Sequence, residues 1–526
     1  MEEGRGHSVT GLQLSFFTAP AVFLGLLLIK ILAARISKRL PPGPTPWPVV
    51  GNLPLLGTLP HVSFAKLAER YGPLMGMRIG SVNCLIVSSA KYAEEVLKTN
   101  DRIWAARPRT SASELLLYGN SDISSMSYGH RWRYARRIFT LEVLTNKKLA
   151  EFQKSRRRIV LGTLNTMLDE CKGGRAVRVD LVLRKMIMTV VSKMLMNKAD
   201  LSAKVEALKD SDDFQDNIKD FFVLLGVFNI GDYIPWLNGF DLQGYNKRMR
   251  IAAKKIDEFL QGIIDDHLER HKLRKQSGAN DEDYVQDLVD VMLTRPTDDD
   301  GRKLTLEEIK GIIENVLFAG TDTSADTVEW ALSQLIRNPR VLQKLQEELD
   351  SKVGRERLVE ESDVPNLPYL QAVVKETFRL HTVAPLLAPH ESADACTIGG
   401  YEIPAKTRLF VNLYVIHRDP ERWEKPLDFY PERFLEQDKD VNGTDFDLLP
   451  FGTGRRMCPG KNFGSLSVHW ILAVLIHACE WSLPGEQRIE DLDMREKFGL
   501  TIGRKTPLAA VAVRRLAEKV IGNTAS

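Results

Sequence analysis

The eleven residues PFGTGRRMCPG, Pro450 to Gly460, place a single cysteine, Cys458, between a loop rich in glycine and arginine and a long apolar run. This run extends from Phe463 to Cys479 and predicts a helix that begins just after the cysteine. Backbone N–H groups and the helix dipole at such a position favour a thiolate over a thiol. Because glycines let the backbone approach closely, this thiolate could ligate haem iron from one side.

The alternative role for Cys458 is that of a small buried hydrophobe, which is common for a lone cysteine in a large chain. The surrounding residues favour the first interpretation. Phe451, Gly454, Arg456, Cys458 and Gly460 match every fixed position of the pattern F-x-x-G-x-R-x-C-x-G. In this pattern the chain resembles the cytochrome P-450 family. The resemblance implies a mostly α fold with small β-sheets, and haem b with Cys458 as the axial ligand of its iron.

The composition excludes some classes of function. The 526 residues include 72 Lys and Arg against 69 Asp and Glu, a net charge of +3, which argues against a nucleic-acid protein held by phosphate contacts. The five cysteines form no C-x-x-C pair, so they indicate neither a zinc site nor a disulfide framework. Scattered cysteines of this kind are typical of a reducing compartment, such as the cytosolic side of a membrane.

The N-terminal region is expected to lie outside the globular fold. Residues 12–34 form an apolar run whose only charge is Lys30, and the run is long enough to span a bilayer as a transmembrane anchor. Basic residues within 35–39 follow it, and this asymmetry places the following chain in the cytosol and residues 1–11 in the lumen. A cleaved signal peptide is the alternative, but its positive charge would precede the apolar core.

Residues 35–50 are basic and rich in proline. Because each proline fixes φ and removes a hydrogen-bond donor, they predict a stiff hinge before a catalytic domain over residues 51–526. This hinge resembles that of microsomal members of the family, in which it orients the catalytic body on the endoplasmic reticulum membrane. The resemblance therefore implies a membrane protein whose catalytic domain faces the cytosol.

The longest predicted helix begins at Thr305, which forms a T-x-x-E capping box with Glu308, and can run to Asn338 before a proline. In its middle lies AGTDTS, residues 319–324, where a glycine and two threonines are unfavourable for a helix interior. A close helix crossing at the glycine is the simplest explanation. The hexapeptide also resembles, at every position, the family's oxygen-activation motif (A/G)-G-x-(D/E)-T-(T/S).

By that resemblance, Gly320 leaves room beside the haem for dioxygen, and Thr323 offers its hydroxyl to the reacting oxygen. Asp322 helps to relay protons from solvent through water. Cleavage of the O–O bond needs protons at the distal oxygen, so a hydroxyl and a carboxylate side by side in sequence suit this task.

Glu376 and Arg379 in KETFRLH stand at i,i+3 on a predicted helix. As a solvated ion pair they would contribute only about 0.2–0.5 kcal/mol. Together with Arg433 in FYPERF they resemble the E-R-R triad of the family. The resemblance implies a structural role, in which the triad locks the segment that carries the Cys458 loop.

Trp132 and Arg136 in WRYAR stand at i,i+4 and share one helix face. In the family this face donates to the haem propionates, and the resemblance adds Arg456 and His390, in APHES, as further donors. Haem carries two carboxylates, so several cationic or polar donors are chemically reasonable. For Arg136 alone, an ordinary solvated basic helix is the alternative.

Many basic residues lie on this helix and the segment after it, namely Arg131, Arg133, Arg137, Lys147, Lys148, Arg156, Arg157 and Arg158. A solvated face is the usual reason for such a charge run. In the family this face lies on the cysteine side of the haem. The resemblance implies docking of NADPH–cytochrome P-450 reductase, through which NADPH supplies electrons.

The segments AGTDTSADTVEWA and FNIGDYIPWLNGFDLQGY resemble the plant group that contains flavonoid and phenylpropanoid hydroxylases. The implied reaction inserts one oxygen atom from O2 into a C–H bond of a small hydrophobic or aromatic substrate. A terpenoid or another specialised metabolite is the alternative substrate. The substrate pocket is expected to draw on residues 107–122, 221–236, 318–323 and 383–387.

Two other classes of function are considered. A haem-thiolate isomerase or dehydratase needs no reductase, but such relatives tend to lack the acid–threonine pair that Asp322 and Thr323 form here. A non-catalytic membrane scaffold would be expected to have lost the cysteine or a residue of the triad, and all four are present.

Overall fold

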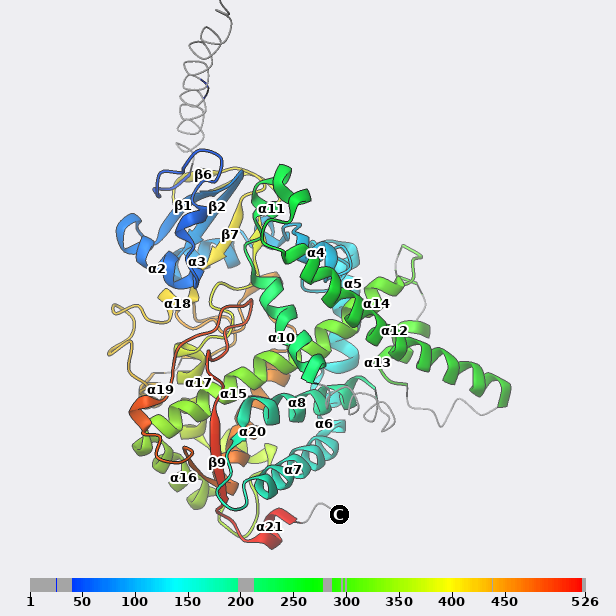
Figure 1. Cartoon of the computed structure of the whole chain (residues 1–526), viewed down its shortest axis with the longest axis vertical. Helices are drawn as coiled ribbons and strands as arrows, with labels where there is room; N and C mark the ends of the chain where they lie inside the picture. The colour runs from blue at the N-terminus through cyan, green and yellow to red at the C-terminus, as the bar shows by residue number, and fades with distance from the viewer. Residues whose placement is uncertain are drawn as a thin grey trace, which may run out of the picture.

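The protein is described here from a computed structural model, which places Gly25 and residues 40–196, 212–277, 286–294, 297–298, 300–437 and 439–522. This part of the chain is mostly helical with small β-sheets, as predicted. In Figure 1 the strands β1, β2, β6 and β7 lie together at one end, β9 lies toward the other end, and helices make up most of the rest. None of the helices among these residues is both long and apolar enough to cross a membrane. The predicted anchor, 12–34, lies outside the described residues except for Gly25.

The α-helices are α2 (Pro60–Tyr71), α3 (Ala90–Glu94), α4 (Ser111–Leu115), α5 (His130–Val143), α6 (Asn146–Glu151), α7 (Gln153–Glu170), α8 (Val179–Leu195), α10 (Asp212–Gly226), α11 (Ile230–Tyr233), α12 (Tyr245–Ser277), α13 (Leu288–Thr294), α14 (Leu306–Glu314), α15 (Gly320–Arg337), α16 (Pro339–Lys352), α17 (Pro368–Leu380), α18 (Leu413–Ile416), α19 (Arg433–Glu436), α20 (Lys461–Ala478) and α21 (Glu518–Gly522). Short 3-10 helices are η1 (Leu53–Leu55), η3 (Ile103–Ala105), η4 (Pro235–Phe240), η7 (Glu361–Asn366), η8 (Gly454–Arg456) and η9 (Ile489–Asp491), and the π-helical turns are η2 (Glu95–Thr99) and η6 (Asn315–Ala319).

The strands form three small sheets. They are β1 (Leu74–Ile79), β2 (Val82–Val87), β7 (Arg408–Val411) and β4 (His390–Glu391) in the first, β3 (Val177–Arg178), β9 (Ala509–Arg514) and β8 (Cys479–Ser482) in the second, and β5 (Cys396–Ile398) with β6 (Tyr401–Ile403) in the third. β1 and β2 form a hairpin, which the alternating residues LMGMRIG, the turn residues after them and the apolar run NCLIVSS predict. β7 then pairs with β2 in parallel, with Cys84 opposite Arg408, and β4 adds to β7 with His390 opposite Leu409. Two segments far apart in sequence thereby reach one sheet.

The long predicted helix is present as α14, η6 and α15 in succession. Its capping box forms as expected, because Glu308 N donates to Thr305 Oγ1 at 3.2 Å and Thr305 N donates to Glu308 Oε2 at 2.8 Å. The π-helical turn η6 was not predicted. It comes just before the AGTDTS segment, in which Thr323 Oγ1 donates back to the carbonyl oxygen of Ala319 at 2.7 Å.

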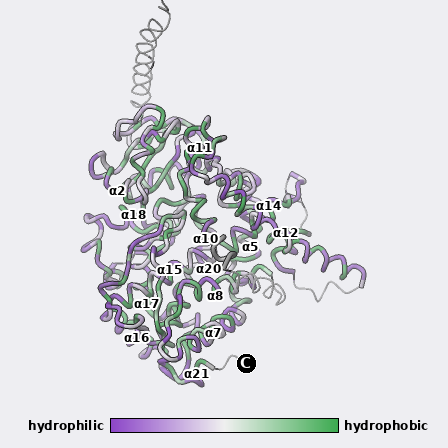
Figure 2. Tube along the Cα trace, viewed as in Figure 1, coloured by the Kyte–Doolittle hydropathy of each residue, from purple (hydrophilic) through white to green (hydrophobic). Residues whose placement is uncertain are grey.

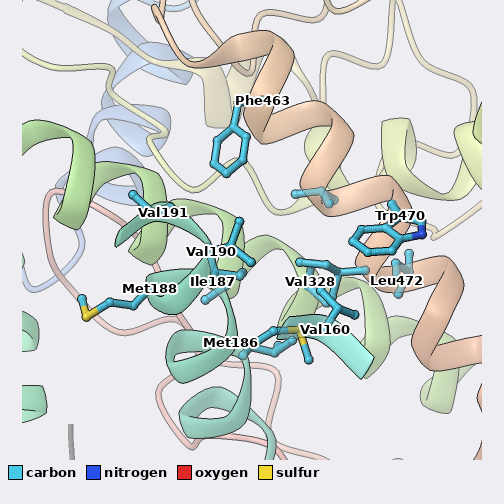
Figure 3. Close-up of a cluster of buried hydrophobic side chains, with 14 of the residues drawn as sticks. Val160, Met186, Ile187, Met188, Val190, Val191, Val328, Phe463, Trp470 and Leu472 are labelled. Atoms are coloured by element: carbon cyan, nitrogen blue, oxygen red, sulfur yellow. The ribbon is translucent and has the colours of Figure 1, made fainter. Parts of the chain in front are cut away.

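Helix α15 is held inside the molecule by apolar packing. It contacts α8, α17 and α20, and most of its residues are buried. Figure 3 shows the side chains between these helices, which include Val160 of α7, Met186, Ile187, Val190 and Val191 of α8, Val328 of α15, and Phe463, Trp470 and Leu472 of α20. Hydrophilic residues instead recur along the outer helix α12 (Figure 2). Burial of each such aliphatic or aromatic side chain contributes about 1.5–3 kcal/mol to the stability of the fold. These contacts therefore hold α15 in place.

Glu314, at the end of α14, is an exception within this apolar region. Both of its carboxylate oxygens are buried without a hydrogen-bond partner in the described part of the chain. Burial, together with the nearby Asp122, raises the pKa of this carboxyl group well above its usual value. The group is therefore neutral in the folded protein at pH values where it is ionised in the unfolded chain.

Replacing this residue, as Glu314→Leu, should increase the free energy of unfolding by about 1–3 kcal/mol at pH 8. An acid with a raised pKa in the folded state contributes stability below its unfolded pKa, and this contribution is lost as the pH rises above that value. The gain from the substitution should therefore be larger at pH 8 than at pH 5. Denaturant unfolding at both pH values measures it, and an equal gain at the two would contradict the assignment.

Candidate active site

A cavity of about 310 Å³ separates α15 from the loop before α20. One wall includes Gly320 and Thr323, and the opposite wall includes Cys458 and the residues around it. The predicted haem residues Trp132, Arg136, Gly320, Thr323, His390, Arg456 and Cys458 all line this cavity. The structure thus brings together seven residues that are spread over more than half of the sequence.

The backbone of the Cys458 loop is fixed by its own hydrogen bonds and glycines. Cys458 N donates to the carbonyl oxygen of Phe451 at 2.9 Å, which closes the loop just before α20. Gly454 has a φ of 68°, and a Cβ atom there would lie 2.3 Å from the carbonyl oxygen of Leu97. No side chain fits at this position, so the glycine is required for the close approach of the loop.

Cys458 is exposed, and it borders the cavity. Other residues of the protein surround it. Burial raises the pKa of its thiol, whereas the backbone N–H of Gly460 and the cations Arg136 and Lys461 lower the pKa by less. The backbone N–H and the two cations act in the expected direction, toward the thiolate, and burial acts against them. A metal ion at the sulfur would supply the missing stabilisation, since thiolate ligation is coupled to loss of the proton.

Three half-buried arginines carry positive charge beside the cavity. Arg136 Nη2 donates to the carbonyl oxygen of Met457 at 2.7 Å, and Arg456 Nε donates to that of Ala105 at 2.7 Å. Arg107 Nη1 donates to two backbone carbonyl oxygens, at 2.7 and 2.8 Å. None of the three forms an ion pair with a carboxylate of the described residues. Burial is the main cause that lowers the pKa of Arg456 to about 8 and that of Arg107 to about 10.

Uncompensated buried charge is costly, so this wall is suited to an anionic group. The two carboxylates of haem fit such a set of donors, and guanidinium groups bind carboxylates well. Trp132 is part of the same wall, because its ring lies 5.4 Å from the guanidinium of Arg136 and 4.7 Å from that of Arg456. Its indole N–H is already used, since it donates to the carbonyl oxygen of Ile123 at 3.0 Å.

His390 lies in the wall as a neutral imidazole. Its Nδ1 lies 2.7 Å from the carbonyl oxygen of Trp104, so Nδ1 carries the proton and Nε2 is an acceptor. Burial and then the charge of Arg107 lower the pKa of His390 well below its usual value. His390 therefore donates to a carboxylate only as an imidazolium, a form that a bound carboxylate would itself favour.

Arg107 was expected only as part of the substrate-pocket segment 107–122, and the sequence did not reveal it as a cation beside Cys458. The segment around it, AARPR, contains two arginines within three residues and no signal that distinguishes them. Its burial depends on carbonyl oxygens of Ala388 and Pro389, which lie far away in the sequence.

Asp322 lies on the other side of α15 and does not line the cavity. Arg184 of α8 forms ion pairs with both Asp322 and Asp326, and Thr501 Oγ1 donates to Asp322 Oδ2 at 2.7 Å. These residues line a separate polar cavity of about 200 Å³. The separation follows from helix geometry, because adjacent residues of a helix point in different directions.

The predicted triad forms a buried cluster. Arg379 donates from Nε to Glu376 Oε2 and from Nη2 to Glu376 Oε1, both at 2.8 Å, and Arg433 Nε donates to Glu376 Oε1 at 3.2 Å. Arg379 also donates to the carbonyl oxygens of His417, Pro426 and Asp428. The cluster therefore ties α17 to α19 and to the chain between them.

A second cavity, which we call the upper cavity, has a volume of about 140 Å³ and shares Arg107, Ser124, Leu387 and Ala388 with the first. All four segments expected to line the substrate pocket contribute to the two cavities. Residues near 60, 408 and 500 also line the upper cavity and were not predicted. Thr382, which follows RLH at the end of α17, lies outside both cavities, and its Oγ1 lies 2.7 Å from His417 Nδ1.

Comparison with known proteins agrees with this geometry. A family model described as Cytochrome P450 matches residues 41–509. A flavonoid 3'-monooxygenase of Arabidopsis thaliana is 38% identical over 96% of this chain and 98% of its own, and one of Petunia hybrida is 40% identical over 95% and 98%. A zebra fish cytochrome P450 solved with progesterone has a TM-score of 0.69 and 26% identity, covering 86% of this chain and 99% of its own. The chain therefore belongs to the cytochrome P450 family, and it is a haem-thiolate monooxygenase.

Proposed function

We propose that this protein hydroxylates a flavonoid or a related plant phenolic, with electrons from NADPH delivered by a reductase. The observation that carries the proposal is the pair of adjacent cavities, which are lined mainly by apolar residues, one of them bordered by Thr323 and Cys458. The two flavonoid 3'-monooxygenases that match nearly the whole chain support a substrate of this class. A terpenoid is the second candidate, since apolar walls alone suit it equally well.

Haem, when bound, activates dioxygen for insertion into a C–H bond, and the residues of the cavity have separate tasks. Cys458 would ligate the iron, while Arg136, His390 and Arg456, with Nη2 of Arg107, would hold the carboxylates. Trp132 would support them through its ring, which lies against Arg136 and Arg456. Gly320 would leave space at the cavity. A Cβ atom there would meet only Val191, at 3.5 Å, so packing of the described residues does not require a glycine.

The proposal is tested with the haem-loaded protein, reductase and NADPH. Flavonoids, phenylpropanoid esters and terpenoids are offered separately, and the product mass is measured. A flavonoid product heavier by one oxygen atom is expected. Oxidation of terpenoids alone would favour the second candidate. A rearranged product formed without reductase would instead indicate an isomerase.

We also propose that Thr323 and Asp322 deliver protons to the reacting oxygen. Thr323 lines the cavity and Asp322 reaches the polar cavity behind α15, so the two residues connect opposite sides of one helix. Arg184 and Thr501 would hold the Asp322 carboxylate in place. General acid catalysis of this kind contributes about 10²–10⁴-fold in other enzymes.

Thr323→Ala and Asp322→Asn should each lower the yield of hydroxylated product per NADPH, by up to about a hundredfold. The electrons would then appear as hydrogen peroxide or water. Asp326→Asn is the matched control, because it shares Arg184 but lies one turn further along α15. If Asp322→Asn and Asp326→Asn lower the yield equally, Asp322 has only a structural role.

The basic surface near Cys458 is smaller than the sequence suggested. Arg131 is engaged with Asp298 and Glu308, and Arg156 donates to both oxygens of Glu361, at 2.8 and 2.7 Å. Arg133, Arg137, Lys147 and Arg158 are exposed. We propose that these four residues form the docking surface for an acidic reductase.

Arg133→Glu with Arg137→Glu should slow reductase-dependent turnover at low ionic strength by roughly tenfold, since opposite charges speed encounter. Turnover driven by added peroxide should be unchanged, because it needs no partner. Arg250→Glu on α12 is the control for a change of net charge elsewhere on the surface. Equal losses in the reductase and peroxide assays would exclude a docking role.

We further propose that residues 12–34 anchor the protein in the endoplasmic reticulum membrane, with residues 1–11 in the lumen, 35–50 as the hinge and 51–526 in the cytosol. Large apolar side chains are exposed near the hinge, namely Trp47, Val49, Trp236, Phe240 and Leu242. The segments 47–49 and 236–242, which carry these side chains, lie on either side of the turn between β1 and β2. In that turn Gly80 N donates to the carbonyl oxygen of Val50, and Ser81 N donates to that of Tyr233. Release of the full chain from membranes by alkaline carbonate would contradict the anchor.

A further inference from the structure

Arg408, in β7, is a buried cation in the wall of the upper cavity, with only 5% of its surface exposed. Its Nη2 reaches a single acceptor, the carbonyl oxygen of Asp232, at 3.5 Å. Its Nε is buried without a partner. A guanidinium offers five N–H donors, so almost all of its capacity is unused. Arg379, which is equally buried, makes five hydrogen bonds.

The charge of Arg408 is not neutralised by an acid within the described chain. The nearest carboxylate of the cavity wall, that of Asp232, accepts from Ser111 N and Ser111 Oγ, both at 2.7 Å, and forms no ion pair with Arg408. The guanidinium instead lies 4.6 Å from the ring centre of Tyr233. Tyr233 stabilises the cation through its ring and through its hydroxyl. The side chain is thus held in place while its Nε, which has no partner, stays available for another acceptor.

The position of Arg408 suits one end of an elongated aromatic molecule. The upper cavity lies next to the cavity of Cys458 and Thr323, since the two share four lining residues, including Arg107 and Leu387. Its other walls are largely apolar, with Leu117, Leu225, Phe228, Phe410, Leu500 and Ile502. Arg107 lies at the junction, where its Nε and Nη1 donate to three backbone carbonyl oxygens, which leaves only Nη2. Arg408 therefore has more unused donors than Arg107.

We propose that Arg408 binds an acidic oxygen of the substrate, a phenolate or a carboxylate, at the end remote from the carbon that is hydroxylated. This inference rests on the proposed function, and it narrows the substrate to aromatic molecules that carry such a group. Hydrogen bonds between a guanidinium and an anionic oxygen are about twice as strong as neutral ones. The buried setting strengthens them further, because less water competes there.

The test is equilibrium binding to the haem-loaded protein, followed by the change in haem absorption as ligand is added. Two matched pairs serve as probes: a hydroxyflavone with its methyl ether, and a cinnamic-type acid with its methyl ester. We expect the wild-type protein to bind the acidic member of at least one pair about tenfold or more tightly, as loss of a charged hydrogen bond predicts. Arg408→Met should remove this preference, and Arg408→Lys should retain part of it.

Lys406→Met is the control, because it removes an exposed positive charge two residues away and outside the cavity. It should leave the preference intact. A response in the flavone pair alone identifies a phenolate as the ligand, and a response in the cinnamic pair alone identifies a carboxylate. If Arg408→Met does not take up haem, Arg408→Lys and Arg408→Gln provide the comparison between a kept and a lost charge.

Equal weakening of acidic and neutral probes in Arg408→Met would overturn the proposal, because it would show a structural role. A wild-type protein that prefers neither member of either pair would overturn it too. Since binding is measured without turnover, absence of flavonoid product would count against the proposed function alone. Hydroxylation of flavonoids without any binding preference for the acidic member would count only against the proposed role of Arg408.

Discussion

Replacing Cys458 by serine should abolish monooxygenase turnover and the thiolate-type Soret shift of the reduced, carbon monoxide-bound protein. The thiolate donates electron density to iron and so favours O–O cleavage, and a serine oxygen does not replace it. No other described cysteine lines the cavity, so none can take over its role. This is the largest effect on activity that we expect from any single substitution.

Cys396→Ser is the matched control for Cys458→Ser. Cys396 is half-buried in β5 and lines neither the cavity nor the loop around Cys458. Its variant should keep both the spectrum and turnover. A thiolate-type spectrum that persists in Cys458→Ser would falsify the assignment of the iron ligand.

Breaking the triad should produce the largest loss of stability. Glu376→Gln should lower the free energy of unfolding by about 3–5 kcal/mol, because it leaves Arg379 and Arg433 buried without their counter-charge. Glu376 and Arg379 are fully buried, so solvent cannot compensate for the loss. Denaturant unfolding followed by both tryptophan fluorescence and haem absorption measures the effect.

The control for the triad is an exposed ion pair of the same kind, Arg340 with Glu432. Arg340→Met should cost no more than about 1 kcal/mol, because the arginine side chain is 55% exposed and water screens the pair. If Glu376→Gln costs no more than Arg340→Met, the triad does not lock the Cys458 segment.

The sequence was most informative where a motif is local. The capping box at Thr305, the β1–β2 hairpin and the shared helix face of Trp132 and Arg136 all follow from short spacings, and the structure contains each of them. Seven of the expected site residues meet in one cavity. They could be named from the sequence because they belong to four segments that match motifs of one family. Helix and strand periodicity alone would have given the elements without their arrangement.

What the sequence could not show depends on distant contacts. Arg107 and Arg408 matter because they are buried with few or distant partners, and this burial arises only when remote segments pack together. Asp322 and Thr323 are neighbours in sequence, yet the helix sends them to different cavities. The pKa of Cys458 depends on desolvation, which a sequence pattern does not report.

The parallel pairing of β2 with β7 also constrains when the chain can fold during its synthesis. β2 is the apolar strand VNCLIV, and its second edge stays unpaired until β7 has been made. More than three hundred residues separate Cys84 from Arg408. At typical translation rates the edge of β2 therefore remains unpaired for on the order of half a minute. An exposed apolar edge is a site for aggregation, so the nascent chain should depend on chaperones until the ribosome has passed β7.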